Sequence, residues 1–300
     1  MLATAFRGID RVLEMGYSID EIAPRGNFTT HVGLDFFPEI AKLRALRRLW
    51  ARIMKERYGA KDPSSLHFRS GVGIAGSILT ALQPENNIAR GAVAAVASVL
   101  GGSHGITVPS FDEALSIPTK KSVSISTATQ HIVAYETGIP DVIDPLGGSY
   151  YVEMLTDKIE GEIVDYLKQI EAQGGIVKAI ESGWVGREIM RSSVLRQKEI
   201  DSGERIVVGV NKFVSDEKPS YEIHRSDPAV EEEMKRRVKK LREERDNSAV
   251  QRSLEKLQKA AQGKDNLVPF LADAVETYAT IEEVTNTLVA VFGRWKQPAF

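Results

Sequence analysis

The chain has 300 residues, of which 42% are hydrophobic and 27% are charged, enough apolar material for a globular protein with a sizeable core. Its 39 basic and 41 acidic side chains leave a net charge of −2, so no excess positive charge favours nucleic acid. Cysteine is absent, which excludes disulfides, thiolate metal sites and cysteine nucleophiles. The charged N-terminal segment and the lack of a long apolar stretch lead us to expect a cytoplasmic protein with no membrane partner.

The first half of the chain alternates helical and strand-like patterns. A helix is predicted after Pro38, because apolar residues share one helical face as far as Met54 and Gly59 suits a left-handed end. Such alternation is typical of βα units on a parallel sheet, which predicts the α/β class. The other elements expected in this half are strands over Leu66–Arg69 and Ser103–Val108 and helices over Ile88–Leu100 and Lys120–Thr137.

The second half is dominated by long amphipathic helices. One strand is expected at Ile206–Phe213, and a highly charged helix begins at Asp227 and is interrupted near Asp246. The basic run in that helix is flanked by glutamates, which favours a solvated helix face over a binding patch. We therefore divide the chain into residues 1–150, with the βα units, and residues 151–300, mostly helical.

Common catalytic motifs are missing from the sequence. There is no P-loop, no GxSxG and no HExxH, and the five histidines are too scattered to predict a metal site. The segment Gly71–Gly76 matches GxGxxG, but Pro84 and the lack of a following strand argue against a dinucleotide site. Glycines there better suit a close approach of the backbone to something bulky.

Three basic side chains are candidate ligand contacts. Arg25, Arg69 and His104 are expected at or just after the ends of strands, where α/β barrels bind ligands, although structural ion pairs remain an alternative for each. Asp112 with Glu113 suits either a general base or the acidic first turn of the next helix, and the helix-terminus interpretation is favoured.

Taken together, ordered segments along the whole chain resemble the large subunit of adenosylcobalamin-dependent acyl-CoA mutases, the methylmalonyl-CoA mutase family. The segments that carry the resemblance are DEIAPRGNF (Asp20–Phe28), DFFPEIAKLRALRRLWARIMKERYGA (Asp35–Ala60), QPENNIARGAVAAVASVLGG (Gln83–Gly102), SFDEALSIPT (Ser110–Thr119), TQHIVAYETGIPDVIDPLGGSYYVE (Thr129–Glu153), GGIVKAIESG (Gly174–Gly183) and DSGERIVVGVNKF (Asp201–Phe213).

This resemblance implies the C-terminal part of a (β/α)8 TIM barrel, followed by a mostly helical region that wraps against partners. About three barrel strands are expected, near Ile22–Phe28, Leu66–Arg69 and Ser103–Val108, and the opening strands of the family are missing. The family's cobalt-ligating motif, DxHxxG, is also absent. We therefore expect a split enzyme whose partners are a polypeptide with the missing barrel strands and a small cobalamin-binding subunit.

The chain departs from the family pattern at the expected pocket. Where the family has RxHxQTSG, the histidine is replaced by Gly71 and the glutamine by Gly73. Where it has GGTQSLHTNS, the glutamine is His104 and the histidine is Thr107. In the motif APRLSFF, Arg25 is kept while the serine is replaced. If the pocket is catalytic, fewer polar groups and more glycines predict a substrate that is bulkier than methylmalonyl-CoA or that lacks the usual carbonyl contact.

The activity that the resemblance implies is a radical rearrangement of the carbon skeleton of an acyl-CoA, with adenosylcobalamin as cofactor. A non-catalytic assembly subunit is the alternative, because family membership fixes a fold and not a site. The resemblance assigns catalytic positions to His104, Arg69 and Gly71, cofactor contacts to Gln130, Glu136 and Gly73, and substrate contacts to Arg25, Asn27 and Thr107.

Overall fold

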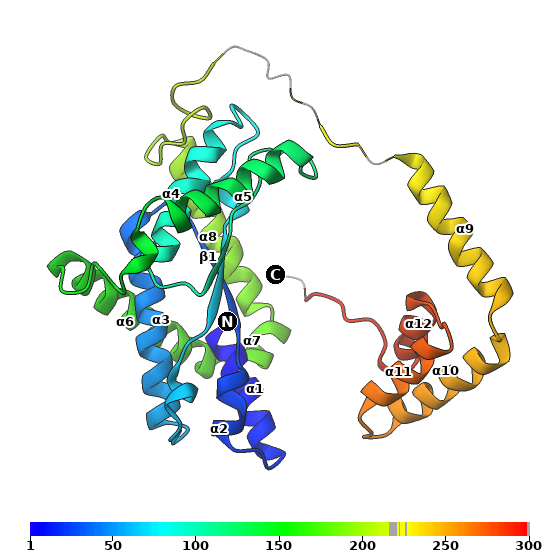
Figure 1. Ribbon diagram of the computed structural model, residues 1–300. Coiled ribbons are helices and arrows are strands. Elements are labelled where there is room, and N and C mark those ends of the chain that lie inside the picture. The colour runs from blue at the N-terminus through cyan, green and yellow to red at the C-terminus, as the bar shows by residue number, and fades with distance from the viewer. Residues whose placement is uncertain (216–220, 222, 226, 299–300) are drawn as a thin grey trace. The chain divides into compact units, whose positions relative to one another are not determined.

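A computed structural model describes residues 1–215, 221, 223–225 and 227–298 and divides into two compact units, Met1–His224 and Arg225–Gln297 (Figure 1). Each unit is considered by itself. The division predicted at residue 150, between a barrel segment and a wrapping region, remains a prediction. None of the helices in the described part of the chain is long and apolar enough to cross a membrane.

The first unit contains a three-stranded parallel sheet in the order β1 (Phe28–Val32), β2 (Ser70–Ile74) and β3 (Gly105–Thr107). Helix α3 (Phe36–Glu56) connects β1 to β2, and α4 (Asn86–Leu100) connects β2 to β3. These are consecutive βα units, because parallel strands need a crossover connection. The prediction of an α/β fold with parallel strands is therefore confirmed.

Two of the predicted strands were placed too early in the chain. The segment before β1 is a short helix, α2 (Ile19–Ile22), followed by a 3-10 turn at Ala23–Arg25, and a second 3-10 turn occupies Pro63–Leu66. Pro24 and Pro63 favour these turns, because proline fixes φ and cannot donate to a ladder. The third predicted strand is confirmed, since β3 lies within Ser103–Val108.

The strand expected at Ile206–Phe213 is also wrong. In the described residues, only one isolated bridge forms there, between Val208 and Lys212. Gly209 has φ +80° and Phe213 has φ 55°, so the chain turns back on itself where an extended strand was predicted.

The core of the first unit lies on one side of the sheet. Val32, Val72 and Ile74 pack against Ile40 of α3 and Ala94 of α4, and all of these side chains are buried. The small side chains of α4 allow its backbone to approach the sheet closely. A second cluster, centred on Trp50, joins α3 to the N-terminal helix α1 (Leu2–Glu14). The helix predicted from its apolar face after Pro38 is confirmed as α3, and the helix predicted at Ile88–Leu100 is confirmed as α4.

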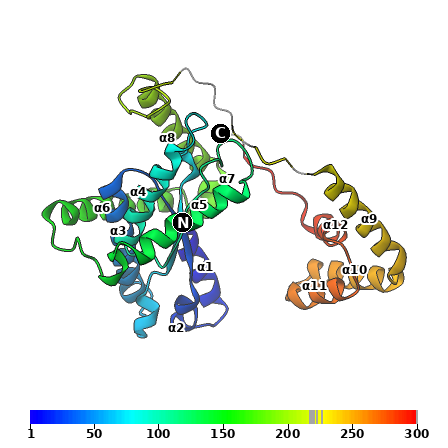
Figure 2. The ribbon, with the colours of Figure 1, turned by 45° about the horizontal axis from the view of Figure 1, so that its top comes forward.

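Further helices cover the outside of α3 and α4. Helix α5 (Lys120–Tyr135) packs on α4, and α6 (Tyr150–Ala172) runs along α3 (Figure 2). Arg44 of α3 pairs with Asp144 and Glu153, and Glu160 of α6 pairs with two further arginines of α3. The first unit continues with a 3-10 turn at Gly76–Ile78, another at Ile139–Asp141, α7 (Ile176–Glu181) and α8 (Trp184–Asp201).

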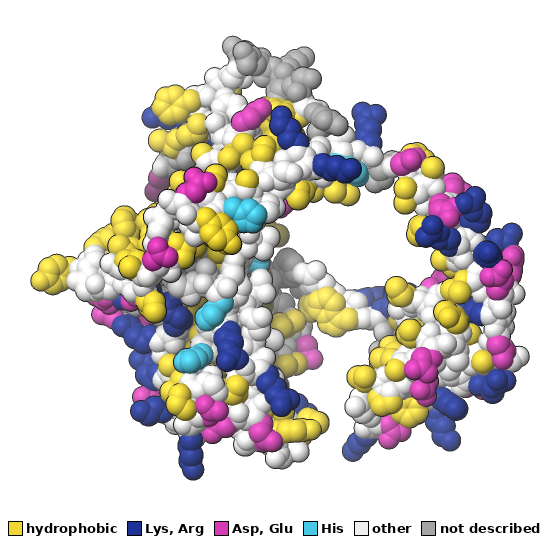
Figure 3. Space-filling view, viewed as in Figure 1, with side chains coloured by type: hydrophobic (Ala, Val, Ile, Leu, Met, Phe, Trp, Pro, Cys, Tyr) yellow, Lys and Arg dark blue, Asp and Glu magenta, His cyan; other side chains and the backbone are white. Residues whose placement is uncertain are grey.

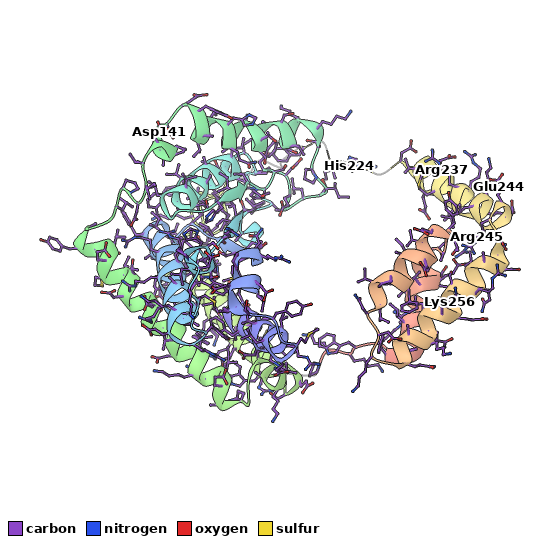
Figure 4. The ribbon with its side chains drawn as sticks, turned by 60° about the horizontal axis from the view of Figure 1, so that its bottom comes forward. Asp141, His224, Arg237, Glu244, Arg245 and Lys256 are labelled. Carbon is purple, nitrogen blue, oxygen red and sulfur yellow. The ribbon has the colours of Figure 1, made fainter. Side chains whose placement is uncertain are left out.

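The second unit is helical, with α9 (Pro228–Glu244), α10 (Asn247–Gln262), α11 (Leu267–Glu276) and α12 (Ile281–Phe292). The predicted interruption is confirmed: the carboxylate of Asp246 accepts bonds from the amides of Ser248 and Ala249 and begins α10. Arg237 of α9 donates to Glu233 at 2.8 Å, so part of the basic run is paired along its own helix. Figure 4 labels charged residues along this unit, including Arg237, Glu244, Arg245 and Lys256.

Candidate functional site

The side of the sheet opposite α3 and α4 carries the candidate site. Side chains alternate along a strand, so every second residue faces away from the core. The strand register aligns these residues in two rows across the sheet, Thr29–Gly71–Gly105 and His31–Gly73–Thr107. All six are exposed or half-exposed, and we call them the open face.

In the first row of the open face, Gly71 and Gly105 bear no side chain, and we call the surface that they form the glycine floor, or empty floor. A Cβ added to Gly71 would have only the carbonyl oxygen of Phe28 near it, at 4.0 Å, and one added to Gly105 would meet nothing within 4 Å. The face therefore has room above it for a bulky group. The sequence prediction that these glycines allow a close approach to the backbone is consistent with this geometry.

The second row holds the one titratable side chain of the open face, His31. A Cβ added to Gly73 would lie 3.2 Å from Cδ2 and 3.3 Å from Nε2 of this imidazole, so the ring lies across the glycine. The sequence prediction missed His31 as a site residue, because a lone histidine in Phe28–Val32 carries no motif. Only its alignment with Gly73 in the register places it at the site.

The structure brings together three of the nine predicted site residues. Gly71, Gly73 and Thr107 lie on the open face, in neighbouring strands. Gln130 and Glu136 do not belong to this face, since Gln130 is on α5 and Glu136 directly follows it. The amide of Gln130 donates to the carbonyl of Ser126 at 3.3 Å, within its own helix, and Glu136 is exposed.

The remaining four lie at the amino ends of the strands, which corrects the expected placement of Arg25, Arg69 and His104 after strand ends. The reason is that β1, β2 and β3 begin after these residues. The guanidinium of Arg69 donates to the carbonyl of Pro24, and His104 Nδ1 accepts from the amide of Ser70 at 3.3 Å. Arg25 and Asn27 are exposed just before β1.

Asp112 has a structural environment. It is 3% exposed, and its carboxylate accepts bonds from the amide and hydroxyl of Thr119, which caps α5. Asp112 thus contacts the N-cap residue of α5 but does not lie in the acidic first turn that was predicted, since α5 has no acidic residue there. Its other oxygen, Oδ1, is buried with no hydrogen-bond partner among the described residues.

A cleft of about 630 Å³ lies beyond the carboxyl ends of β1 and β2, and the sequence prediction missed it too. It is lined by residues that follow these strands, such as Leu34 and Leu79, and by α8 with the segment after it. Arg90 in its wall donates to Thr80 and to the carbonyl of Val208. Burial lowers the pKa of Arg90, and its bonds tie the wall together.

Metal-binding geometry is absent from the described ranges, where no group of three or more His, Cys, Asp or Glu side chains converges. The space-filling view shows histidine side chains dispersed over the first unit (Figure 3). The open face itself is built from glycine, hydroxyl and imidazole groups.

The fold and the open face define the class: an α/β protein built from consecutive βα units, with helices on one side of a parallel sheet and an open, glycine-rich side opposite. Residues 1–294 match the family profile described as Methylmalonyl-CoA mutase. The chain belongs to the methylmalonyl-CoA mutase family.

Curated proteins match this chain over nearly its whole length. The 2-hydroxyisobutanoyl-CoA mutase large subunit of Aquincola tertiaricarbonis is 38% identical over 302 residues, which cover 100% of this chain and 54% of that protein. Human mitochondrial methylmalonyl-CoA mutase is 39% identical over 286 residues, covering 95% of this chain and 38% of the human protein. Methylmalonyl-CoA mutase of Escherichia coli K12 is 37% identical over 299 residues, 99% of this chain and 42% of that protein. The chain thus spans about half the length of these relatives, or less.

Proposed function

We propose that this chain is part of the catalytic subunit of an adenosylcobalamin-dependent acyl-CoA mutase that rearranges the carbon skeleton of an acyl-CoA other than methylmalonyl-CoA. The observation that carries the proposal is the open face: in a member of this family, Gly71 of the central strand and Gly105 beside it have unoccupied space above them, and Gly73 is covered only by the ring of His31. A pocket with such a floor suits a bulky acyl group.

The edges and the open face of the sheet support the proposal that strands of another polypeptide complete a barrel. Among the described residues, β1 and β3 each pair on one side only, and the open face has no second layer. Unpaired strand edges and an uncovered sheet face are unfavourable in water, so further strands are expected to extend the sheet. We propose that β1, β2 and β3 are the last three strands of a (β/α)8 barrel, with the open face lining its interior. A partner polypeptide supplies the opening strands.

In this proposal the acyl-CoA lies along the strands, with its CoA portion at their amino ends. Arg25 and Asn27, exposed at the amino end of β1, bind the CoA portion, because an exposed guanidinium suits phosphate oxygens. The acyl group then lies over Gly71 and extends towards Gly73 with its covering His31 ring and towards Thr107. Arg69 and His104 are fixed at the amino ends of their strands by their own hydrogen bonds and shape that end of the pocket.

The residues present fit a bulky organic cofactor better than a metal ion. The unobstructed space above Gly105, beside the acyl group over Gly71, leaves room for a bulky group, and Gly73 belongs to the same surface. When bound, adenosylcobalamin supplies a carbon-centred radical that starts the rearrangement. In this proposal a small cobalamin-binding subunit holds the cobalt, Gln130 and Glu136 lie near the adenosyl group, and the chain's own task is to orient the acyl group and exclude water.

The proposal is tested by reconstitution. The chain is co-expressed with one polypeptide carrying the opening barrel strands and another carrying the cobalamin-binding domain. The complex is then incubated anaerobically with adenosylcobalamin and branched acyl-CoA thioesters. Mass spectrometry and chromatography of the acyl-CoA isomers should show rearrangement of a bulky branched substrate and little of methylmalonyl-CoA, with a cobalamin-free complex as the control.

Two results would contradict the proposal in different ways. An assembled complex that binds cobalamin but rearranges no acyl-CoA would favour the non-catalytic assembly subunit. Tight binding of adenosylcobalamin by the isolated chain, seen as a base-off spectrum, would refute the division of labour between subunits.

A further inference from the structure

We infer that His31 is the specificity-determining residue of the open face and that it donates a hydrogen bond to an oxygen on the acyl group of the substrate, beyond the thioester. The inference rests on the proposed function, since it concerns which acyl group the same site accepts.

The first step concerns the freedom of the imidazole. His31 is exposed, and the structure places no described side chain or backbone group within hydrogen-bonding distance of its ring nitrogens; only its backbone carbonyl is engaged, by Lys42 at 2.7 Å. A neutral imidazole has one donor and one acceptor to offer. The ring is thus an available polar group on a surface that is otherwise glycine and threonine.

The second step concerns the position of the ring. It lies across Gly73, where an added Cβ would be 3.2 Å from Cδ2, so the absence of a side chain at position 73 is what makes room for it. Thr107 aligns with Gly73 on its other side, in β3. Adjacent strands are about 4.8 Å apart. The imidazole therefore covers Gly73, and the hydroxyl of Thr107, one strand spacing beyond the glycine, is the other polar group of the same row.

The third step concerns the rest of the acyl group. The row Thr29–Gly71–Gly105 is two residues closer to the amino ends, which places its empty floor about 6.6 Å from the row of His31. With CoA bound at the amino ends, the thioester lies over the floor and the distal part of the acyl group reaches His31. The ligand class that fits is an acyl-CoA with a bulky acyl group bearing a hydroxyl or other oxygen function.

The experiment compares two probes that differ by one hydroxyl, isobutanoyl-CoA and 2-hydroxyisobutanoyl-CoA. Their dissociation constants are measured by calorimetry on the reconstituted complex, together with kcat/KM. The wild-type complex should prefer the hydroxylated probe, and His31→Ala should reduce that preference about tenfold, since a site built to bond an oxygen discriminates against analogues lacking it. His31→Gln, which keeps a hydrogen-bond donor, should restore part of the preference.

The matched control is His67→Ala, another exposed histidine, which precedes β2 and lies outside the open face. This variant should leave the preference unchanged. Wild type and His31→Ala with the same ratio of affinities, or a wild-type complex that does not prefer the hydroxylated probe, would overturn the inference while leaving the proposed function standing. A wild-type complex that binds neither thioester would overturn both.

Discussion

Gly91 of α4 lies directly against Val108, the residue that follows β3: a Cβ added to the glycine would come within 2.9 Å of Val108 Cγ1. Val108 is 6% exposed and belongs to the core that holds α4 against the sheet. This close approach fixes the carboxyl end of β3, and with it Thr107, relative to the central strand. The open face therefore depends on a glycine on the opposite side of the sheet.

Gly91→Ala should destabilise the protein. Overpacking of a filled core costs about 1–3 kcal/mol, which outweighs the gain of about 1 kcal/mol that alanine brings to a helix interior. Denaturant unfolding should show a lower midpoint. Gly8→Ala is the matched control, since Gly8 is also helical, in α1, but has nothing within 4 Å of an added Cβ. A midpoint for Gly91→Ala at or above that of wild type would refute the close-packing argument.

The helices were predictable from sequence because their signals are local. The apolar face from Ile40 to Met54 and the glycine at 59 define α3 to within a few residues, and Gly59 has the expected positive φ of +68°. The end of the predicted helix Ile88–Leu100, directly before Gly101, likewise agrees with the end of α4. Neither signal depends on residues far away in the chain, so tertiary structure did not overrule it.

The strands were less predictable because a strand is defined by its neighbours. The segment SGVGI (Ser70–Ile74) has two glycines and low intrinsic strand propensity, yet it is the central strand, because Val72 and Ile74 are buried and both edges are paired. His31 was missed for the same reason. Its meeting with Gly73 depends on the register between β1 and β2, which no local pattern contains.

The attachment of α6 should weaken in acid. Arg44, only 11% exposed, donates to Glu153 at 2.7 Å, and this bond together with one from the amide of Gly148 lowers the pKa of Glu153 to about 2. A lowered folded-state pKa means that the stabilisation is present above the ordinary value of 4.5 and is lost as pH falls towards 2. Hydrogen exchange of α6 amides, compared over this range, should show faster opening at the acid end.

Glu153→Gln tests whether the opening of α6 in acid is caused by protonation of this carboxylate or by protonation of other groups. The amide cannot carry the charge that Arg44 binds, so exchange in α6 should be faster at neutral pH and should change less between pH 4.5 and 2 than in wild type. Glu162→Gln is a suitable control, because Glu162 lies on α6 but is 61% exposed. Identical pH profiles for wild type and Glu153→Gln would show that this pair does not hold α6 in place.

Glu283 should control the acid stability of the second unit. Arg245, 5% exposed, binds both oxygens of Glu283, which lowers the pKa of Glu283 to about 2, and the amide of Thr280 also donates to it. Its contribution is therefore also lost between pH 4.5 and 2. Glu283→Gln should cost about 1–3 kcal/mol at pH 7, the range for a charge-assisted pair.

The measurement is hydrogen exchange in α12, with Glu282→Gln as the neighbouring control. Glu282 is 69% exposed and meets Arg242 alone in the described part of the chain, so its replacement should have little effect. Equal effects of the two substitutions would contradict a specific role for the pair between Arg245 and Glu283.

Gly71→His tests whether the open face has been adapted to a different substrate. An added side chain at 71 meets open space, with only the carbonyl of Phe28 near its Cβ, so the variant should fold normally. In the reconstituted complex, a new hydrogen bond to the substrate of about 1.4 kcal/mol would raise turnover of methylmalonyl-CoA about tenfold, and the filled space should lower turnover of the bulkier native substrate. Gly73→His is the matched control, because its Cβ would meet the ring of His31, and it should give no such gain. A wild-type complex that already turns over methylmalonyl-CoA at about 1 per second or faster would refute the adapted pocket, because the glycine floor would then have no effect on substrate choice.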